Sequence, residues 1–137
     1  MITVSRQDII DTNRRIIEQW NEKHPDKQEK LCVRRDALDE SYSIFENTGD
    51  NSVTRENLVK KAAYLMGSIS WAQPFCGANK RTAMLVTATF LNKNEIKMEP
   101  YDEKHVRELL YDIQDERGRL NKNTMNKIIL YISKSIK

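Results

Sequence analysis

The chain has 137 residues, of which 39% are hydrophobic and 31% are charged, and its formal net charge is +3. This length suits one domain with a real core and is too short for two. Such a mild positive charge does not by itself indicate a nucleic-acid or membrane surface, and no apolar run approaches the length needed to span a bilayer.

The two cysteines, Cys32 and Cys76, form no metal-like cluster and are too few for a disulfide framework. We therefore expect a reducing, cytoplasmic setting. The N-terminal sequence lacks the basic-then-apolar pattern of a secretory signal, which agrees with that expectation.

The hydrophobic pattern is helical almost throughout the chain. A first helix is expected to begin at Ser5, with Asp8 completing a capping box, and to end before Pro25. A short second helix is expected to be capped by Asp36 or Asp39. The residues before it are a candidate for an extended segment, a short β flap.

A long helix is expected from about Thr54 to Ala72. The next one is expected to start near Asn79 and to end at a left-handed cap on Asn94. Its middle, "TAMLVTATFL" at residues 82–91, carries no charge. We therefore expect the helix from Asn79 to be the central, buried one.

Two further helices follow, for which Asp102 and Thr124 are the expected N-caps. No series of strands is visible between them. The sequence therefore predicts an all-α fold of about six helices in a single domain spanning residues 1–137.

A tight corner, "QPFCGANKR" at residues 73–81, precedes the uncharged helix. The N-terminus of a helix presents free backbone N–H groups and partial positive charge. Gly77 and Ala78 leave that backbone accessible, and Lys80 and Arg81 add two full charges. Cations oppose the helix dipole here unless an anion binds. The corner therefore predicts an anion site, most naturally for phosphate.

The corner has two other interpretations. It can be a plain connection in which Phe75 fills the core while Lys80 and Arg81 are solvated. A DNA-binding helix-turn-helix is disfavoured because a recognition helix needs polar side chains on its outer face, and residues 82–91 do not supply them.

The stretch "QPFCGANKRTA" resembles the signature of the Fic/Doc (Fido) family, approximately H-x-F-x-[D/E]-[A/G]-N-[K/G]-R. The matching positions are Phe75, Ala78, Asn79, Lys80 and Arg81. "RRDALDESY" and "TATFLNKNEI" resemble the segments that flank this motif in the family, so the resemblance extends from about residue 33 to the end. "NKRTA", with Met84 in place of a second arginine, is similar to the Doc-like (death-on-curing) branch.

The resemblance implies an all-helical Fic domain that binds a nucleoside triphosphate, with ATP expected. Family members transfer AMP (AMPylation) or, in the Doc-like branch, phosphate to a hydroxyl of a target protein. Many Doc-like members are toxins of toxin–antitoxin pairs. Carried over to this chain, Asn79, Lys80 and Arg81 are the phosphate ligands, with the backbone at Gly77 and Ala78 beside them.

The expected partners follow from the same resemblance. They are a protein target, a translation factor by family analogy, or an antitoxin-like protein. Neither DNA nor a membrane is expected, and homodimerisation is left open.

The chain departs from the family pattern at the two positions that carry the chemistry. Gln73 stands at the position of the general-base histidine, and a carboxamide does not titrate near neutral pH. Loss of a general base typically lowers a rate by ~10²–10⁴-fold. Gly77 replaces the acid that holds Mg²⁺, so the resemblance leaves the metal open and no metal ligand is assigned.

The sequence therefore predicts a Doc-like Fic protein that binds a nucleotide with weak or absent transfer. Two alternatives stay open: an active transferase that uses a non-histidine mechanism, and a non-catalytic protein-interaction domain.

Overall fold

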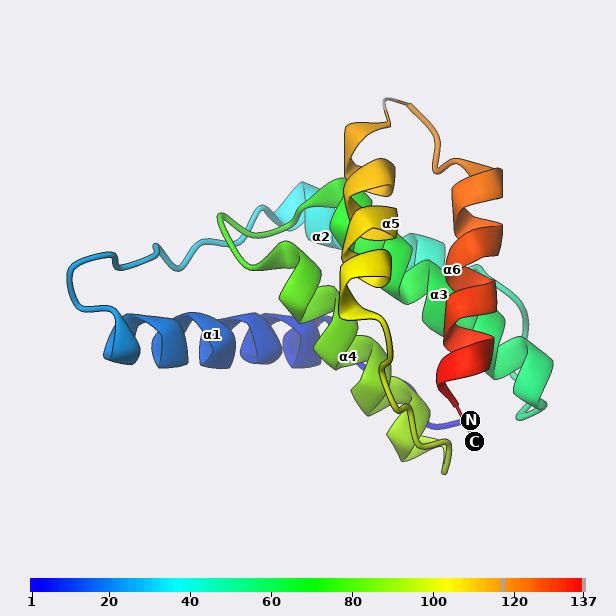
Figure 1. Ribbon diagram of the computed structural model, residues 1–137. Coiled ribbons are helices and arrows are strands. Elements are labelled where there is room, and N and C mark those ends of the chain that lie inside the picture. The colour runs from blue at the N-terminus through cyan, green and yellow to red at the C-terminus, as the bar shows by residue number, and fades with distance from the viewer. Residues whose placement is uncertain (117, 137) are drawn as a thin grey trace.

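The computed structural model describes residues 1–116 and 118–136 of the chain. Within these residues it contains helices and two isolated β-bridges, and no strand. The all-α prediction is confirmed. The helices are α1 (Arg6–Lys23), α2 (Arg35–Glu46), α3 (Arg55–Ala72), α4 (Asn79–Lys93), α5 (Glu103–Asp115) and α6 (Lys122–Ser135) (Figure 1).

The extended segment before α2 is shorter than a flap of paired strands. In the described part of the chain it amounts to one antiparallel bridge between Val33 and Phe75. The expected β flap is thus reduced to a single pairing, but that pairing joins the segment before α2 directly to the corner before α4.

The centre of the fold is α3, which packs against α2, α4, α5 and α6. The main neighbours of α4 are α3 and α1, and its Leu85 is 46% exposed. The expectation that the helix from Asn79 is the central one is therefore corrected. An uncharged helix need not be buried on all sides, since single apolar residues are common on protein surfaces.

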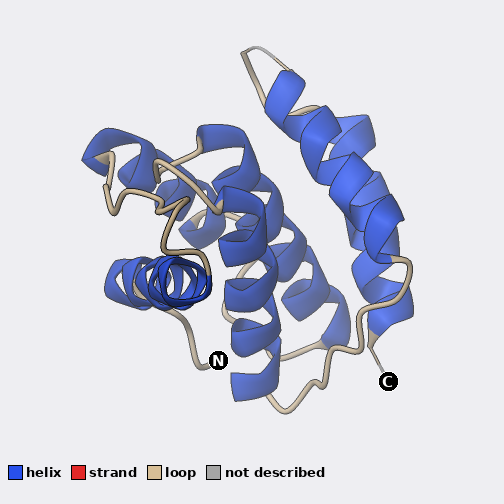
Figure 2. Cartoon of the chain, turned by 60° about the vertical axis from the view of Figure 1, so that its left-hand side comes forward, coloured by secondary structure: helices blue, strands red, loops and turns tan. Residues whose placement is uncertain are grey.

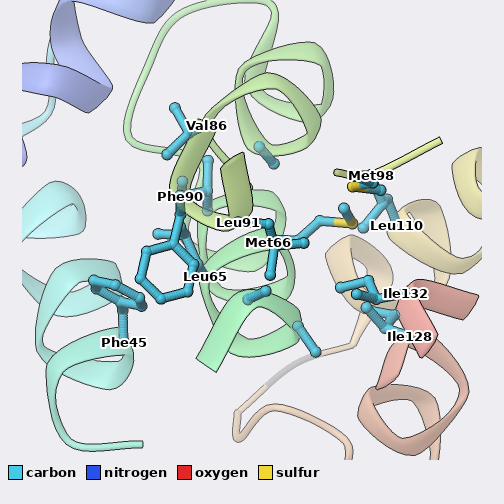
Figure 3. Close-up of a cluster of buried hydrophobic side chains, with 14 of the residues drawn as sticks. Phe45, Leu65, Met66, Val86, Phe90, Leu91, Met98, Leu110, Ile128 and Ile132 are labelled. Carbon is cyan, nitrogen blue, oxygen red and sulfur yellow. The ribbon is translucent and has the colours of Figure 1, made fainter. Parts of the chain in front are cut away.

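The helices lie on two sides of α3. On one side α5 and α6 run beside each other as an antiparallel pair, and α1, α2 and α4 lie on the other (Figures 1 and 2). The core is continuous through α3 (Figure 3). Phe45 and Phe90 meet edge to face at 5.2 Å between ring centroids, and Met66 lies toward the side of Leu110 and Ile132.

Three of the expected helix starts are confirmed. At α1 the Ser5 side chain accepts from the Asp8 N–H, and the Asp8 carboxylate accepts from the Ser5 N–H at 2.8 Å. Thr54 caps α3, and Asp102 caps α5. Each of these caps depends on residues three positions apart, which is why the sequence reveals them.

Three other helix ends differ from expectation. Helix α2 begins after Arg34 without a side-chain cap, so neither Asp36 nor Asp39 fills that role. Helix α6 is capped by Asn121, which accepts from the Thr124 N–H at 3.0 Å, so Thr124 is inside the first turn.

At the end of α4, Asn94 has φ −102° and is not left-handed; the left-handed residue is Glu95, with φ 64°.

None of the described helices combines the length and the apolar character that crossing a membrane requires.

Candidate functional site

The loop between α3 and α4 spans residues 73–78 and is bounded by two left-handed residues. Gln73, the C-cap of α3, has φ 49° and ψ 62°, and Ala78, the N-cap of α4, has φ 60° and ψ 28°. A residue with a side chain in this region costs of order 1–3 kcal/mol and persists only where surrounding contacts impose it. The contacts that impose it come from three separate parts of the chain.

Arg34 holds the first half of the loop. Its backbone N–H donates to the Pro74 carbonyl at 2.7 Å. Its guanidinium donates to the carbonyls of Gln73 at 2.8 Å and of Phe75 at 3.0 Å. The Phe75 side chain is 1% exposed and lies in the core. The first half of the loop is therefore fixed from both sides.

A disulfide bond between Cys32 and Cys76 ties the same two segments covalently, with 5.5 Å between their Cα atoms. The sequence, with too few cysteines for a disulfide framework, did not predict this bond. Cys32 and Cys76 are separated by 44 positions, and only the fold brings them together. A pair of cysteines in a short chain does not reveal this from spacing alone.

Asn79 closes the loop on itself. Its Oδ1 accepts from the Phe75 N–H at 3.0 Å, and its Nδ2 donates to the Phe75 carbonyl at 2.9 Å. Both polar atoms of the side chain are thus engaged by the loop. The side chain of Asn79, which the motif predicts as a phosphate ligand, thus shapes the loop, and the role of Asn79 toward a phosphate stays a prediction.

The second half of the loop is held from α1. The buried Asn13 donates to the Gly77 carbonyl at 2.9 Å and to the Thr82 hydroxyl at 3.1 Å. Asn13 and Arg34 both escaped the sequence analysis, because their role depends on contacts with residues far away in the chain.

The N-terminus of α4 is open. Ala78 offers no side-chain hydrogen bond to the first turn, and that turn contains no acidic residue. The N–H groups at the start of the helix are therefore left for a ligand or water. Lys80 and Arg81 stand in the same turn, and across the described residues neither lies within ion-pair distance of a carboxylate.

A cavity of about 380 Å³ opens at this helix start. Its volume falls within the range of small-molecule sites. One wall is the motif, and the other is α5, which contributes a third cation and an aromatic ring. The lining residues are Ala78, Asn79, Lys80, Arg81, Arg107 and Tyr111.

Arg107 and Tyr111 were missed by the sequence analysis. They lie one helical turn apart on α5, so they share a face. Arg107 is paired with Glu103 at 2.7 Å, and both side chains are more than half exposed, so an incoming phosphate can compete for the guanidinium. A turn spacing of this kind is too common to identify a site in a sequence.

Lys80 reaches across the cavity to α5. Its ammonium lies 4.2 Å from the centroid of the Tyr111 ring and donates to the Gln114 side-chain oxygen. Burial lowers the pKa of Lys80 below its usual range, and the Asp115 carboxylate offsets part of that effect. A bound phosphate adds negative charge beside the ammonium and raises this pKa again.

Arg81 points the other way around α4. Its guanidinium lies 5.5 Å from the Trp20 ring centroid, and the residue is exposed. Arg81 thus lies between the cavity and α1 and is the more exposed of the two motif cations.

Neither histidine of the chain replaces the missing base. The ring of His24 stacks on Trp20 with 3.7 Å between centroids, and its Nδ1 lies 3.0 Å from the Trp20 carbonyl oxygen. His105 is in the first turn of α5 and is not among the residues that line the cavity. The structure therefore gives neither histidine a place in the wall of this cavity.

A sequence model of the Fic/DOC family matches residues 3–91. The matched range runs from the segment before α1 almost to the end of α4, and it contains the whole loop with Lys80 and Arg81. The chain therefore belongs to the Fic/DOC family. Helices α5 and α6 lie beyond the matched range. No curated protein sequence matches the chain.

Proposed function

We propose that this Fic/DOC protein binds a nucleoside triphosphate, with ATP as the expected one, through its phosphates at the start of α4. One observation carries the proposal: two cations stand at an uncapped helix N-terminus and line a cavity, and neither pairs with a carboxylate in the described part of the chain. A helix N-terminus with such cations stabilises phosphate oxygens by hydrogen bonds and by charge.

The same proposal places the protein in the Doc-like branch. The second arginine of the adenylylating branch is replaced here by Met84. The Met84 side chain is half-buried and packs against the core. The group transferred by an active relative of this kind is phosphate, and the acceptor is a hydroxyl of a target protein. A toxin–antitoxin role, with an antitoxin-like partner, belongs to this part of the proposal.

Transfer by this chain is proposed to be weak or absent. An attacking hydroxyl must lose a proton as its oxygen bonds to phosphorus, and Gln73 can orient that hydroxyl but cannot take its proton. The cavity can still position the triphosphate and neutralise its charge, and positioning alone leaves part of the catalysis intact.

Thermal unfolding with ATP tests the binding proposal. A ligand at 100 times its Kd stabilises a protein by about 2.7 kcal/mol, so wild type is expected to show a clear rise in Tm. Arg81→Ala is expected to weaken ATP binding about 10-fold or more, because a hydrogen bond to a charged group contributes about 1.5–3 kcal/mol. Lys93→Ala, at the other end of α4, is the matched control and keeps the wild-type shift.

An ATP shift of equal size in wild type and in Arg81→Ala contradicts the assignment of the phosphate site. The absence of any shift with ATP, in either protein, contradicts the proposed function as a whole.

Restoring the base tests the catalytic part of the proposal. Gln73→His is expected to raise ATP cleavage at least about 100-fold, because a general base contributes ~10²–10⁴-fold and histidine tolerates the left-handed backbone at this position. Hydrolysis of ATP labelled at the α- or γ-phosphate needs no target protein and shows which bond breaks. Gln73→Asn, which also tolerates that backbone but does not titrate, is the control; a rise in both variants contradicts the role given to the base.

The cytoplasmic location stays a prediction. Disulfides persist mainly in oxidising compartments, and those of cytosolic proteins are usually transient or redox-sensing. The Cys32–Cys76 bond therefore makes its oxidation state in cells informative: thiols trapped by rapid alkylation favour the cytoplasm, and a stable disulfide favours an oxidising compartment.

A further inference from the structure

A carboxylate from another segment occupies the space beside Gly77. A Cβ atom placed on Gly77 would lie 3.4 Å from Cδ of Glu29, and the nearer atom would be the Glu29 Oε2 oxygen. The third of the nearest atoms is Cδ1 of Ile17, at 3.9 Å. Glycine at position 77 thus leaves room for the Glu29 side chain, and an acidic oxygen lies against the loop although residue 77 supplies none.

The backbone that carries Glu29 is held firmly. The Asn21 side chain accepts from the Glu29 N–H at 2.7 Å and donates to the Glu29 carbonyl at 3.0 Å. Before it, the Trp20 indole N–H donates to the Lys27 carbonyl at 2.9 Å. After it, the chain is fixed by the Cys32 disulfide. Contacts before and after Glu29 in the chain therefore hold its backbone beside the loop.

The Glu29 carboxylate has no partner among the described residues. Taking residues 1–116 and 118–136 together, no hydrogen bond or ion pair to its oxygens is found. A lone carboxylate close to a helix N-terminus is favourable in the absence of a ligand. Once a phosphate binds at the same helix start, the two anions repel each other unless a cation lies between them.

A divalent cation resolves that conflict. Mg²⁺ takes oxygen ligands, keeps several waters, and is usually held by one or two carboxylates together with the phosphates of a nucleotide. The described residues contain no group of three or more His, Cys, Asp or Glu side chains that could hold a metal by themselves. A cation that arrives with the nucleotide takes part of its ligands from the phosphates and from water, so it needs only one carboxylate from the protein.

We propose that Glu29 is the protein ligand of the divalent cation that accompanies the bound triphosphate, and that it stands in for the acid missing at Gly77. The inference rests on the proposed function, because without a phosphate beside the loop there is nothing for the cation to bridge. When bound, the cation neutralises phosphate charge. Glu29 contributes one oxygen ligand, and Asn21 holds Glu29 in position.

The test measures ATP affinity by calorimetry, with Mg²⁺ and with a chelator. Wild type is expected to bind ATP at least about 10-fold more tightly with Mg²⁺. Glu29→Gln keeps the size of the side chain and the backbone contacts to Asn21, and it is expected to lose this Mg²⁺ dependence. Glu22→Gln, which removes an exposed acid of α1, is the matched control and keeps it. Mn²⁺ resonance spectra follow the metal itself: Mn²⁺ is expected to bind with ATP and not alone.

A second test moves the carboxylate from residue 29 to residue 77. Gly77 does not adopt a left-handed φ, so a side chain is tolerated there once Glu29 is shortened. The double variant Glu29→Ala/Gly77→Asp puts a carboxylate into the same space from the other segment. It is expected to regain the Mg²⁺ dependence that Glu29→Ala lacks.

The outcomes separate this inference from the function on which it rests. ATP binding that Mg²⁺ does not affect in wild type overturns the role of Glu29 and leaves the phosphate site standing. Equal tightening of ATP binding by Glu29→Gln, with and without Mg²⁺, also overturns it, because Glu29 then acts as an internal competitor of the phosphate. No binding of ATP in either condition overturns the proposed function and the inference with it.

Discussion

Loss of the Cys32–Cys76 disulfide is expected to lower the free energy of unfolding by about 4 kcal/mol. The bond closes a loop between residues 44 positions apart, and a cross-link of that span removes about this much conformational freedom from the unfolded chain. For a domain of this size the corresponding fall in Tm is roughly 10 °C or more. Thermal unfolding of Cys32→Ala/Cys76→Ala beside oxidised wild type measures it.

Reductant provides the control for this experiment. It is expected to lower the Tm of wild type toward that of the double variant and to leave the Tm of the double variant unchanged. If titration of the purified protein under native, oxidising conditions finds two free thiols, the bond does not form and the prediction fails.

Asn79→Ala is expected to destabilise the fold by about 3 kcal/mol and to weaken ATP binding as well. The substitution leaves the N–H of Phe75 without its partner and removes one of the donors to the Phe75 carbonyl. Each buried polar group that loses its partner costs about 1–3 kcal/mol. The loop then no longer holds Ala78 in its left-handed conformation, so the start of α4 is not presented to a phosphate.

Asn94→Ala is the matched control at the other end of α4. Asn94 makes the same pair of contacts to one residue, accepting from the Ile2 N–H at 3.0 Å and donating to the Ile2 carbonyl at 2.7 Å. Its loss is expected to cost stability, though less because Ile2 is exposed, and to leave the ATP-induced shift in Tm intact. An Asn79→Ala protein that binds ATP as tightly as wild type would show that the two hydrogen bonds between the Asn79 side chain and the Phe75 backbone do not matter for ATP binding.

Local signals explain which parts of the fold the sequence predicts. The capping box at Ser5 and Asp8 involves neighbours in the chain, so it is visible without a structure. The end of α3 before Pro74 and the start of α4 at Asn79 are set by equally local chemistry. The start of α4 at Asn79 also gives the position of the candidate site, because the motif lies at that helix start.

The contacts that make the site usable are not local. Arg34, Asn13 and Glu29 reach the loop from segments that the sequence places far away, and no spacing rule connects them to it. The same holds for the wall formed by Arg107 and Tyr111. The expectation that the helix from Asn79 is central is wrong for a different reason. A lack of charge does not measure burial, because the number of helices packed around a segment is a property of the whole fold.

The firmly held loop has a consequence for how a ligand would bind. The carbonyls of Gln73, Pro74 and Gly77, and both polar backbone groups of Phe75, already have partners within the chain. Fixing a backbone residue costs roughly 1–2 kcal/mol of conformational entropy. For this loop the entropy is lost when the protein folds and not when a ligand binds. The loop at residues 73–78 is preorganised, so an anion would bind beside it without ordering a mobile segment. A phosphate that bound there would therefore lose little affinity to ordering of the loop, because folding has already fixed this backbone.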